Sequence, residues 1–277
     1  MKRVRRHRAF AAAVLAGALS FGSSRAARGD GPAAGTTSAG APAPTAAEPG
    51  QDTDPTKPVL FSLRDEHYDL QGGNWINAFI FRKDELLLKK TTFPGQARGL
   101  LLRLELPVTT SYLGGDKNTG LGDGYAQGLL LPRLGGPFIL GIGTGLVIPT
   151  ATDRKLGTGK WTIAPIVAPV WFLPKQGYAL VKIQEFESFA GPSSRPDISF
   201  LLVTPTALWR VSQRNWILVD SESRTSWTQG FTSYRSGFLV GTMFSARAGL
   251  SLKAEVPWGN HRLGDWTLKA VFYLTRF

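Results

Sequence analysis

The sequence has no cysteine and only three histidines among its 277 residues. The lack of cysteine excludes disulfide bonds, thiol nucleophiles, thiolate metal sites and lipid attachment through cysteine. The histidines are His7, His67 and His261, and no HExxH or similar metal-ligand spacing connects them. We therefore expect no catalytic residue, no metal and no cofactor, so the sequence predicts a protein that is not an enzyme.

The sequence also lacks any apolar run of the about 18 residues that a transmembrane helix needs. The apolar stretch 9–21 has 13 residues and follows a basic segment that contains Arg5 and Arg6. The small residues Ser24 and Ala26 come shortly after it. This order is typical of a secretory signal peptide, which we place at residues 1–26.

Acidic residues are fewer than basic ones, partly because of the signal peptide. The formal charge is 32 minus 20, or +12, and without the six basic residues of 1–26 it is 26 minus 20, or +6. A charge of this size fits a surface near anionic lipid headgroups, and we expect no nucleic-acid partner. Residues 27–57 are rich in Ala, Pro, Gly and Thr without periodicity, which predicts a disordered linker before a folded part at 58–277.

Strands of about ten residues with a two-residue period follow one another in the folded part. The stretch GLLLRLELP puts four leucines on one face and Arg103 and Glu105 on the other. The stretch GLSLKAEVPW likewise opposes apolar side chains to Lys253 and Glu255. In a soluble sandwich the charged face would lie outside, whereas in a membrane barrel it lines the interior and the apolar face meets lipid.

The placement of aromatic residues favours the membrane barrel. Trp161 and Trp171 share one face with Ile163 and Val167 and lie ten residues apart. At about 3.3 Å per residue and roughly 40° of tilt, this spacing is on the order of 25 Å, the height of the apolar band between two aromatic girdles. The alternative interpretation is that Trp161 and Trp171 lie in the core of a soluble sheet.

The periodic segments predict an all-β, membrane-spanning, antiparallel up-and-down barrel. Ten strands are expected near 99–109, 123–132, 137–149, 160–173, 177–189, 198–211, 215–227, 236–246, 249–258 and 266–277. Residues 59–68 and 75–90 offer two more, and we favour twelve strands over ten. The connections alternate between short ones at 133–136, 174–176, 212–214 and near Arg247, and long ones at 110–122, 150–159, 190–197, 228–235 and 259–265. Short periplasmic turns and longer external loops are typical of bacterial barrels.

The polar side chains predicted to line the interior carry charges of both signs. They are Arg103, Glu105, Lys182, Gln184, Asp220, Glu222, Arg224, Lys253 and Glu255. Two alternatives remain: the side chains pair across the barrel and fill it, or they line a polar path. Mixed pairing argues against strong ion selectivity.

Glycines share one face of a predicted strand, at Gly141, Gly143 and Gly145. Small residues on an interior face leave space for a plug formed by the N-terminal segment or for a ligand, and they can also simply relieve crowding. These alternatives stay open at the level of the sequence.

The last strand does not alternate cleanly. If Phe277 faces lipid, Tyr273 and Val271 do so as well, but Lys269 then shares their face. The opposite face of this strand is nearly all apolar. Either a bulge changes the alternation or the interior is apolar in this region.

Two stretches resemble the family of outer-membrane proteins named for the meta-pathway of phenol degradation. They are GLGDGYAQGLLLP (120–132) and LGIGTGLVIPTATDRKLGTGKWTIAPIVAPVWF (140–172). The shared signature is a Gly-Leu-Gly-Asp turn, a strand that ends in Pro-Thr, a Leu-Gly-Thr-Gly loop and a strand that opens with Trp. The matching positions are Gly120, Leu121, Gly122, Asp123, Pro149, Thr150, Leu156, Gly157, Thr158, Gly159 and Trp161.

The resemblance covers about residues 60–277, and the Pro- and Ala-rich segment before it departs from the family. It implies an outer-membrane barrel involved in the passage of small, often hydrophobic or aromatic compounds, and no catalytic residue carries over. Two of the matching stretches fall in adjacent external loops of the expected topology. We expect these loops to pack on each other and fix the mouth of the barrel, with Asp123 binding backbone amides.

The leading hypothesis is a passive channel for small molecules in the outer membrane of a Gram-negative bacterium. The alternatives are a non-conducting structural or interaction barrel with a filled interior, an enzyme at the rim that uses His261 near Asp265, and a soluble β-sandwich. Expected partners are outer-membrane lipid, the barrel-assembly machinery through the C-terminal Phe277, and a small-molecule substrate.

Overall fold

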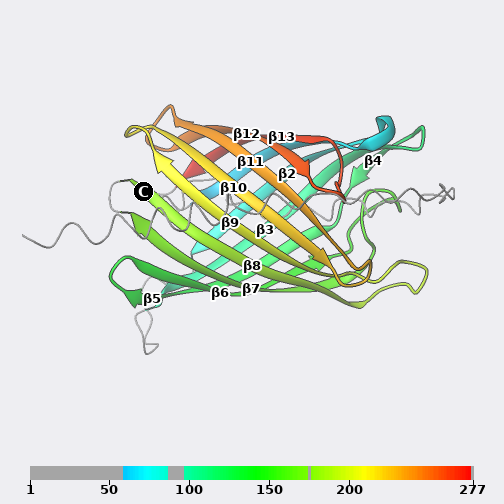
Figure 1. Cartoon of the computed structure of the whole chain (residues 1–277), viewed down its shortest axis with the longest axis horizontal. Coiled ribbons are helices and arrows are strands. Elements are labelled where there is room, and N and C mark those ends of the chain that lie inside the picture. Colours follow the sequence, from blue (N-terminus) through cyan, green and yellow to red (C-terminus); the bar gives the residue numbers. More distant parts are fainter. Residues whose placement is uncertain (1–58, 87–96, 174–175, 276–277) are drawn as a thin grey trace, which may run out of the picture. The chain divides into compact units, whose positions relative to one another are not determined.

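The computed structural model describes residues 59–86, 97–173 and 176–275. The predicted signal peptide (1–26), the predicted linker (27–57) and Phe277 lie outside these ranges. No helix in the described ranges is long and apolar enough to span a membrane. These ranges form one antiparallel sheet that closes on itself as a barrel (Figure 1).

The described residues form thirteen strands and one short 3-10 turn, η1 (Gln71–Gly73). The strands are β1 (Val59–Asp69), β2 (Trp75–Leu86), β3 (Ala97–Leu113), β4 (Asp116–Leu121), β5 (Gly124–Gly135), β6 (Phe138–Ile148), β7 (Trp161–Leu173), β8 (Gly177–Ala190), β9 (Ser199–Arg210), β10 (Asn215–Ser226), β11 (Phe231–Met243), β12 (Ala248–Trp258) and β13 (Trp266–Thr275).

Twelve of these strands, all except β4, form the barrel wall. Each is antiparallel to its neighbours, and β1 pairs with β13 in a register that joins Phe61 to Leu274 and Asp69 to Trp266. This last pairing closes the sheet and leaves no free edge in the wall. The prediction of an antiparallel up-and-down barrel is confirmed, with twelve strands and not ten.

The predicted loop 110–122 is wrong, because most of it is a β-hairpin. Strand β3 continues to Leu113, and β4 returns along its last residues. Gly114 and Gly115 form the connection with φ values of 62° and 88°, a backbone region that favours glycine and that suits a tight hairpin turn. The hairpin extends the wall at one rim (Figure 1).

The two ends of the barrel differ in the lengths of their connections. At the end that we call the turn end, strands are joined by 136–137, 174–176, 211–214 and 244–247. At the opposite end, which we call the loop end, strands are joined by 70–74, 149–160, 191–198, 227–230 and 259–265, besides the hairpin. The connection 227–230 is shorter than predicted because β11 begins at Phe231 and not near residue 236.

Side chains alternate between an outer and an inner face of the wall. On β7, Trp161, Ile163 and Val167 are exposed, whereas Thr162 and Ala164 between them are buried. The same alternation runs through the whole of β12. Because the sheet is closed, the buried set faces the interior and the exposed apolar set faces outward.

The alternation in β13 is opposite to the one that follows if Phe277 faces lipid. Val271 and Tyr273 are buried on the inner face together with Lys269, and Trp266 and Leu268 are exposed on the outer face. The pairing of β13 with β12 is continuous, and the register irregularity in its pairing with β1 lies on β1, between Val59 and Phe61. The sequence left the orientation of this strand open, because the argument was conditional on the direction of Phe277, which lies outside the described residues.

The interior at the turn end is lined by one apolar cluster. Its buried members are Val59, Tyr178, Leu180, Leu208, Trp216, Leu218, Leu239, Met243, Val271 and Tyr273. The ring centroids of Trp216 on β10 and Tyr273 on β13 lie 5.9 Å apart, although two strands separate β10 from β13. The side chains therefore narrow the interior at this end.

Inner-face glycines lie beneath aromatic rings of neighbouring strands. A Cβ atom at Gly145 would lie 2.1 Å from the Tyr125 hydroxyl, and one at Gly241 would lie 2.2 Å from the Trp216 ring. Only a residue without a side chain lets these rings lie flat on the wall. Of the explanations left open for the β6 glycines, the contact at Gly145 supports relief of crowding.

Candidate functional site

The nine residues predicted to line the interior lie on the inner faces of β3, β8, β10 and β12. Arg103 and Glu105 come from β3, and Lys182 and Gln184 from β8. The others are Asp220, Glu222 and Arg224 of β10, and Lys253 and Glu255 of β12. The two-residue period of the strand places them all on the inner face, because each alternates with outward-facing neighbours.

Among the described residues, sequence reasoning missed seven further charged residues on the inner face: Arg64, Glu66, Arg82, Asp84, Arg210, Arg235 and Lys269. The segment of β1 reads FSLRDEHY, in which Asp65 puts a charge on the outer face between Arg64 and Glu66. Because charged residues lie on both faces of this strand, the sequence does not show the two-residue alternation of polar and apolar side chains. The sequence of β13 did contain an indication of an inner-face charge, because Lys269 is the one charged residue in an otherwise apolar and neutral strand.

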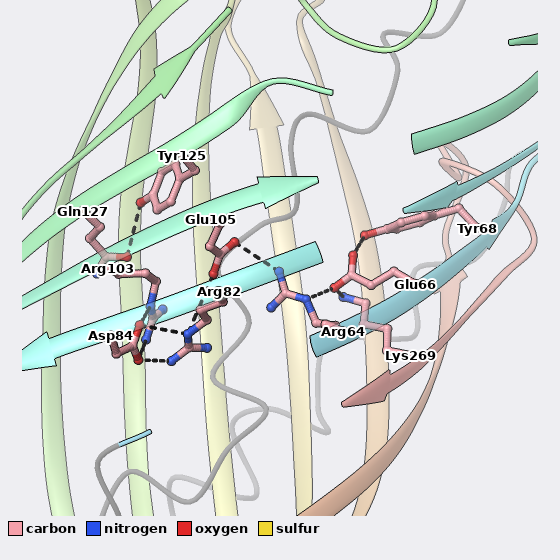
Figure 2. A network of polar contacts seen from close by, with 10 residues as sticks. All are labelled: Arg64, Glu66, Tyr68, Arg82, Asp84, Arg103, Glu105, Tyr125, Gln127 and Lys269. Atoms are coloured by element: carbon pink, nitrogen blue, oxygen red, sulfur yellow. Dashed lines mark hydrogen bonds and ion pairs between the residues drawn. The ribbon is translucent and has the colours of Figure 1, made fainter. Parts of the chain in front are cut away.

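Arg64 of β1 reaches over β2 to β3. Its Nε lies 2.7 Å from Glu66 Oε1, and its Nη2 donates a hydrogen bond to Glu105 Oε2 on β3 at 3.2 Å. Tyr68 donates a hydrogen bond to the same Glu66 carboxylate. Figure 2 shows these side chains converging on the inner wall of β1, β2 and β3.

Asp84 of β2 lies between two guanidinium groups. Arg82 Nη2 donates to Asp84 Oδ2 at 2.5 Å, and Arg103 Nε donates to Asp84 Oδ1 at 3.0 Å. Arg82 Nε also lies 4.0 Å from Glu105 Oε1, which links this group to Arg64 (Figure 2). Hydrogen bonds between guanidinium and carboxylate are stronger than neutral ones, so these contacts hold the side chains in place.

Three cationic side chains, one each from β11, β12 and β13, surround the carboxylate of Glu255 on β12. Its carboxylate oxygens lie 2.7 Å from Lys253 Nζ, 3.1 Å from Lys269 Nζ and 3.4 Å from Arg235 Nη1. Lys269 Nζ is also 3.9 Å from Glu66 Oε1. Lys269 therefore joins the charges of β12 to those of β1 across the seam at which the barrel closes.

Gly237 of β11 allows an ion pair to pass over its strand. Lys253 of β12 and Asp220 of β10 are 2.5 Å apart at Nζ and Oδ2. A Cβ atom at Gly237 would lie 2.6 Å from Asp220 Oδ1 and 2.7 Å from Lys253 Cε. Next to this bridge, Arg235 and Glu222 form a further pair at 3.0 Å.

These twelve side chains form one continuous group, which we call the ion belt. Its members are Arg64, Glu66, Arg82, Asp84, Arg103, Glu105, Asp220, Glu222, Arg235, Lys253, Glu255 and Lys269. Six are cationic and six are anionic, and they span seven adjacent strands from β3 through the seam to β10. Because all are well shielded from solvent, removal of one partner leaves an uncompensated charge, which is strongly destabilising.

The facing wall, from β5 to β9, has a different character. Gln184 Nε2 donates a hydrogen bond to the Tyr125 hydroxyl at 3.0 Å. The rings of Phe186 and Phe200 stack with centroids 4.6 Å apart. The guanidinium carbon of Arg224 lies 3.9 Å from the centroid of Phe200. This wall therefore combines aromatic faces and amides with few charges.

Asp123 joins two connections at the loop end. Its Oδ2 accepts hydrogen bonds from the Thr158 amide at 2.5 Å and from the Thr158 hydroxyl at 2.7 Å, and its Oδ1 accepts one from the Ala151 amide at 3.4 Å. A Cβ atom at Gly157 would lie 2.4 Å from Asp123 Oδ1, so glycine is needed beside the carboxylate. The expected contact between Asp123 and loop amides is present.

Other residues of the family-like motif support the same contact. The Thr150 hydroxyl donates to the Gly122 carbonyl at 2.7 Å and accepts from the Gly124 amide at 2.8 Å. Gly120 packs on the side chains of Thr152 and Leu156, and Leu156 is buried. The remaining motif residues lie apart: Pro149 follows the end of β6, Gly159 has a φ of 70° and packs against Arg195, and Trp161 points outward from β7.

A surface ion pair also connects the hairpin to the long loop. Lys155 Nζ donates a hydrogen bond to Asp116 Oδ2 at 2.6 Å. This hydrogen bond and the positive charge of Lys155 hold the pKa of the Asp116 carboxyl below its ordinary value. Both side chains are solvent-exposed, so the pair contributes little to stability.

Comparison with known proteins finds likeness in structure alone, since no family model and no curated protein matches the sequence. An outer-membrane channel from Pseudomonas putida F1 matches 83% of this chain and 100% of its own, with a TM-score of 0.67 and 14% identity. The NanC porin matches 78% of this chain and 99% of its own, with a TM-score of 0.53 and 8% identity. The KdgM porin in complex with disordered oligogalacturonate gives the same coverage, with a TM-score of 0.52 and 7% identity.

The chain has the fold of outer-membrane channels. Identities of this size show a shared fold and leave the substrate open. Within this porin-like barrel, the ion belt and the aromatic wall of β5–β9 face each other, and the Asp123 contacts fix the loops at one opening. These three features are the candidate functional parts.

Proposed function

We propose that the protein is a channel in the outer membrane of a Gram-negative bacterium and that it passes small molecules, including hydrophobic or aromatic ones. One observation carries the proposal: the barrel is closed, its outer face is apolar and its inner face is charged. Leu104, Val219 and Val256 are all more than half exposed on the outer face. Such a surface is unfavourable in water and suits the hydrocarbon layer.

The proposal extends to export and assembly. Residues 1–26 direct secretion, and the C-terminal Phe277 is read by the barrel-assembly machinery, after which outer-membrane lipid surrounds the wall. Membership of the phenol meta-pathway family is part of the proposal as well. It is supported by the contacts that Asp123 and Thr150 make between the two motif stretches.

Conductance of the refolded mature protein in a planar lipid bilayer tests this function. Steady single-channel current would support an open pore, and substrate screening by liposome swelling would follow. The same recording on a chain without residues 27–57 separates an open barrel from a plugged one. Silence of both proteins, in every salt and at every voltage, would contradict the channel.

A second function, a non-conducting structural barrel, is favoured by the packing of the inner face. In the apolar cluster at the turn end, the rings of Trp216 and Tyr273 lie within contact distance of each other. In the ion belt, the cationic and anionic side chains pair with one another. Both features reduce the space available for a path. Pull-down of periplasmic partners by a silent barrel would support this alternative.

We also propose that the protein is not an enzyme. The alternative of a rim enzyme depends on His261, whose ring stacks on Phe231 with centroids 4.8 Å apart. Stacking of this kind gives His261 a packing role in the loop 259–265. The substitution His261→Ala is expected to leave lipid and peptide composition unchanged, and altered lipid hydrolysis in membranes carrying the variant would revive the enzyme hypothesis.

A further inference from the structure

Polar side chains interrupt the apolar outer face of β1 and β2 near the loop end. Asp65, His67 and Asp69 follow one another on the outward face of β1, and Asn77 faces outward on β2. His67 pairs in register with Asn77 on one side and with Leu268 of β13 on the other. Ionisable groups are rare on a wall that faces lipid, so their presence indicates a site.

Hydrogen bonds join three of these side chains and fix the tautomer of the imidazole. Asn77 Nδ2 donates a hydrogen bond to Asp65 Oδ1 at 2.7 Å, and Asn77 Oδ1 lies 3.3 Å from His67 Nδ1. Because a carboxylate only accepts hydrogen bonds, the Asn77 amide directs its NH2 group toward Asp65. Its oxygen then faces His67, so Nδ1 of the imidazole carries the hydrogen. In the neutral ring, Nε2 is therefore left as an acceptor.

Aromatic rings frame this imidazole on both sides. The ring centroid of His67 lies 5.9 Å from that of Trp75 and 5.1 Å from that of Trp266. Tyr112 of β3 continues the row, with its ring centroid 6.1 Å from that of Trp75. A row of Trp and Tyr rings on the outer face of a membrane barrel marks the level of the lipid headgroups. The imidazole therefore lies where a headgroup meets the wall.

The charge of this outer face is negative near the loop end. Among the described outward-facing residues of β1, β2 and β13, Lys83 is the one lysine or arginine. It lies toward the turn end of β2, in register with Phe61 at the far end of β1 from Asp69. The charges of these strands near the loop end are thus the carboxylates of Asp65 and Asp69. Such a surface attracts a cationic headgroup and repels an anionic one.

From this arrangement we propose that the outer face of β1 and β2 binds a membrane amphiphile whose headgroup carries a primary ammonium group. Asp65 Oδ2 and His67 Nε2 accept hydrogen bonds from the ammonium group. The indole faces of Trp75 and Trp266 add cation–π attraction. The acyl chain lies over Phe79, which pairs in register with Asp65 and is 38% exposed. The inference rests on the membrane location that is part of the proposed function, and it is independent of conduction.

The two outward acceptors favour a primary ammonium group over a quaternary one. Each of them needs a hydrogen to bind, and a trimethylammonium group has none to donate. Charge attraction and contact with the indole rings are common to both kinds of headgroup. The site should therefore distinguish phosphatidylethanolamine from phosphatidylcholine, two lipids that share the phosphate group and can carry the same acyl chains.

The experiment refolds the mature chain into vesicles of equal parts phosphatidylethanolamine and phosphatidylcholine with identical acyl chains. Native mass spectrometry of the protein released in mild detergent then identifies the lipids that stay bound. Bound phosphatidylethanolamine should exceed bound phosphatidylcholine by about threefold, the order that an exposed charged contact gives. Free ethanolamine at the same concentration should not displace the lipid. Displacement would show that the ligand is a soluble amine, which overturns the lipid site.

Two variants test the acceptors separately. Asp65→Asn removes the charged acceptor and should bring the ratio of the two bound lipids close to one. His67→Phe keeps a ring between the indoles and removes the Nε2 acceptor, so it should lower the ratio as well. The matched control is Glu185→Gln, which neutralises an exposed outward carboxylate on β8. It should leave the ratio unchanged, because its register neighbour on β9 is the aliphatic Leu201.

The outcomes separate this site from the proposed membrane location. A chain that enters no vesicle and stays in the supernatant would contradict the location, and the site with it. Insertion with equal binding of the two lipids would overturn the site alone. A preference that survives both Asp65→Asn and His67→Phe, or that Glu185→Gln abolishes as well, would do the same. A dimer that replaces the lipid complex would mean that a second copy covers this face, which also overturns the proposal. Should Asp65→Asn fail to refold, His67→Phe still decides the question.

Discussion

Asp123 is one carboxylate that holds two connections of the loop end together. The variant Asp123→Ala is expected to release residues 151–158 from the turn at 120–124, because the amides of Thr158 and Ala151 lose their acceptor. Loss of such buried, charge-assisted bonds costs about 1–3 kcal/mol. Trypsin cleavage after Arg154 and Lys155, followed by mass spectrometry of the folded protein, measures the release.

The control for this variant is Asp116→Asn, which weakens only an exposed ion pair in the same region. It should leave the rate of cleavage near that of the unmodified protein. Equal cleavage of both variants would show that the Asp123 contacts do not determine how the loop is held.

Gly145 supports the ring of Tyr125 and thus the wall opposite the ion belt. Gly145→Ala should destabilise the barrel by about 1–3 kcal/mol, the usual cost of overpacking, because its Cβ would lie 2.1 Å from the Tyr125 hydroxyl oxygen and 2.6 Å from the nearest ring carbon. The matched variant is Gly128→Ala on the neighbouring strand β5, where a Cβ would find its nearest atom at 3.6 Å. Urea unfolding in lipid vesicles, followed by tryptophan fluorescence, compares the two free energies.

At the scale of the element, the seam between β1 and β13 depends on charge as well as on backbone pairing. Glu66 contacts Arg64 and Lys269, so Glu66→Gln leaves these buried cations with too little negative charge. Breaking a buried ion pair costs about 3–5 kcal/mol. We expect a lower free energy of unfolding for this variant by that order, measured by the same urea titration.

The outward-facing neighbour Asp65 provides the control on the same strand. Asp65→Asn keeps the hydrogen-bonding shape near Asn77 and removes an exposed charge. A change of less than about 0.5 kcal/mol is expected, as for most surface substitutions. If both variants unfolded alike, the stability of the seam would come from backbone pairing alone.

At the scale of the whole molecule, the apolar outer face is what makes the barrel a membrane protein. Leu252 lies at the middle of β12 and is 52% exposed. Leu252→Arg should lower the free energy of unfolding in lipid by about 2–4 kcal/mol, as for arginine near the bilayer midplane. Leu263→Arg, in the loop 259–265, should have little effect because that residue lies outside the apolar band.

These two leucines distinguish a membrane barrel from a soluble one. In a soluble barrel, arginine at either exposed position would be tolerated. Equal stability of the two variants, together with recovery of the protein in the soluble periplasmic fraction, would contradict the proposed location.

The sequence alone determined the twelve strands of the wall and the faces of most side chains, although not the hairpin strand β4. These properties follow from the two-residue period and from turn residues, which are local to one strand. The nine interior residues were placed on strands in this way. The method failed in β1, where Asp65 hides the period of Arg64 and Glu66, and it left the faces of β13 undecided.

Only the tertiary structure decided which charges meet. Arg64 reaches Glu105 over an intervening strand, and Lys253 reaches Asp220 over Gly237, so these pairs depend on register and on the closure of the sheet. No local pattern encodes them, because the partners are separated by 33 to 41 residues in the sequence. The make-up of the ion belt is decided at this level, since it depends on which carboxylates and cations closure of the sheet brings within reach of each other.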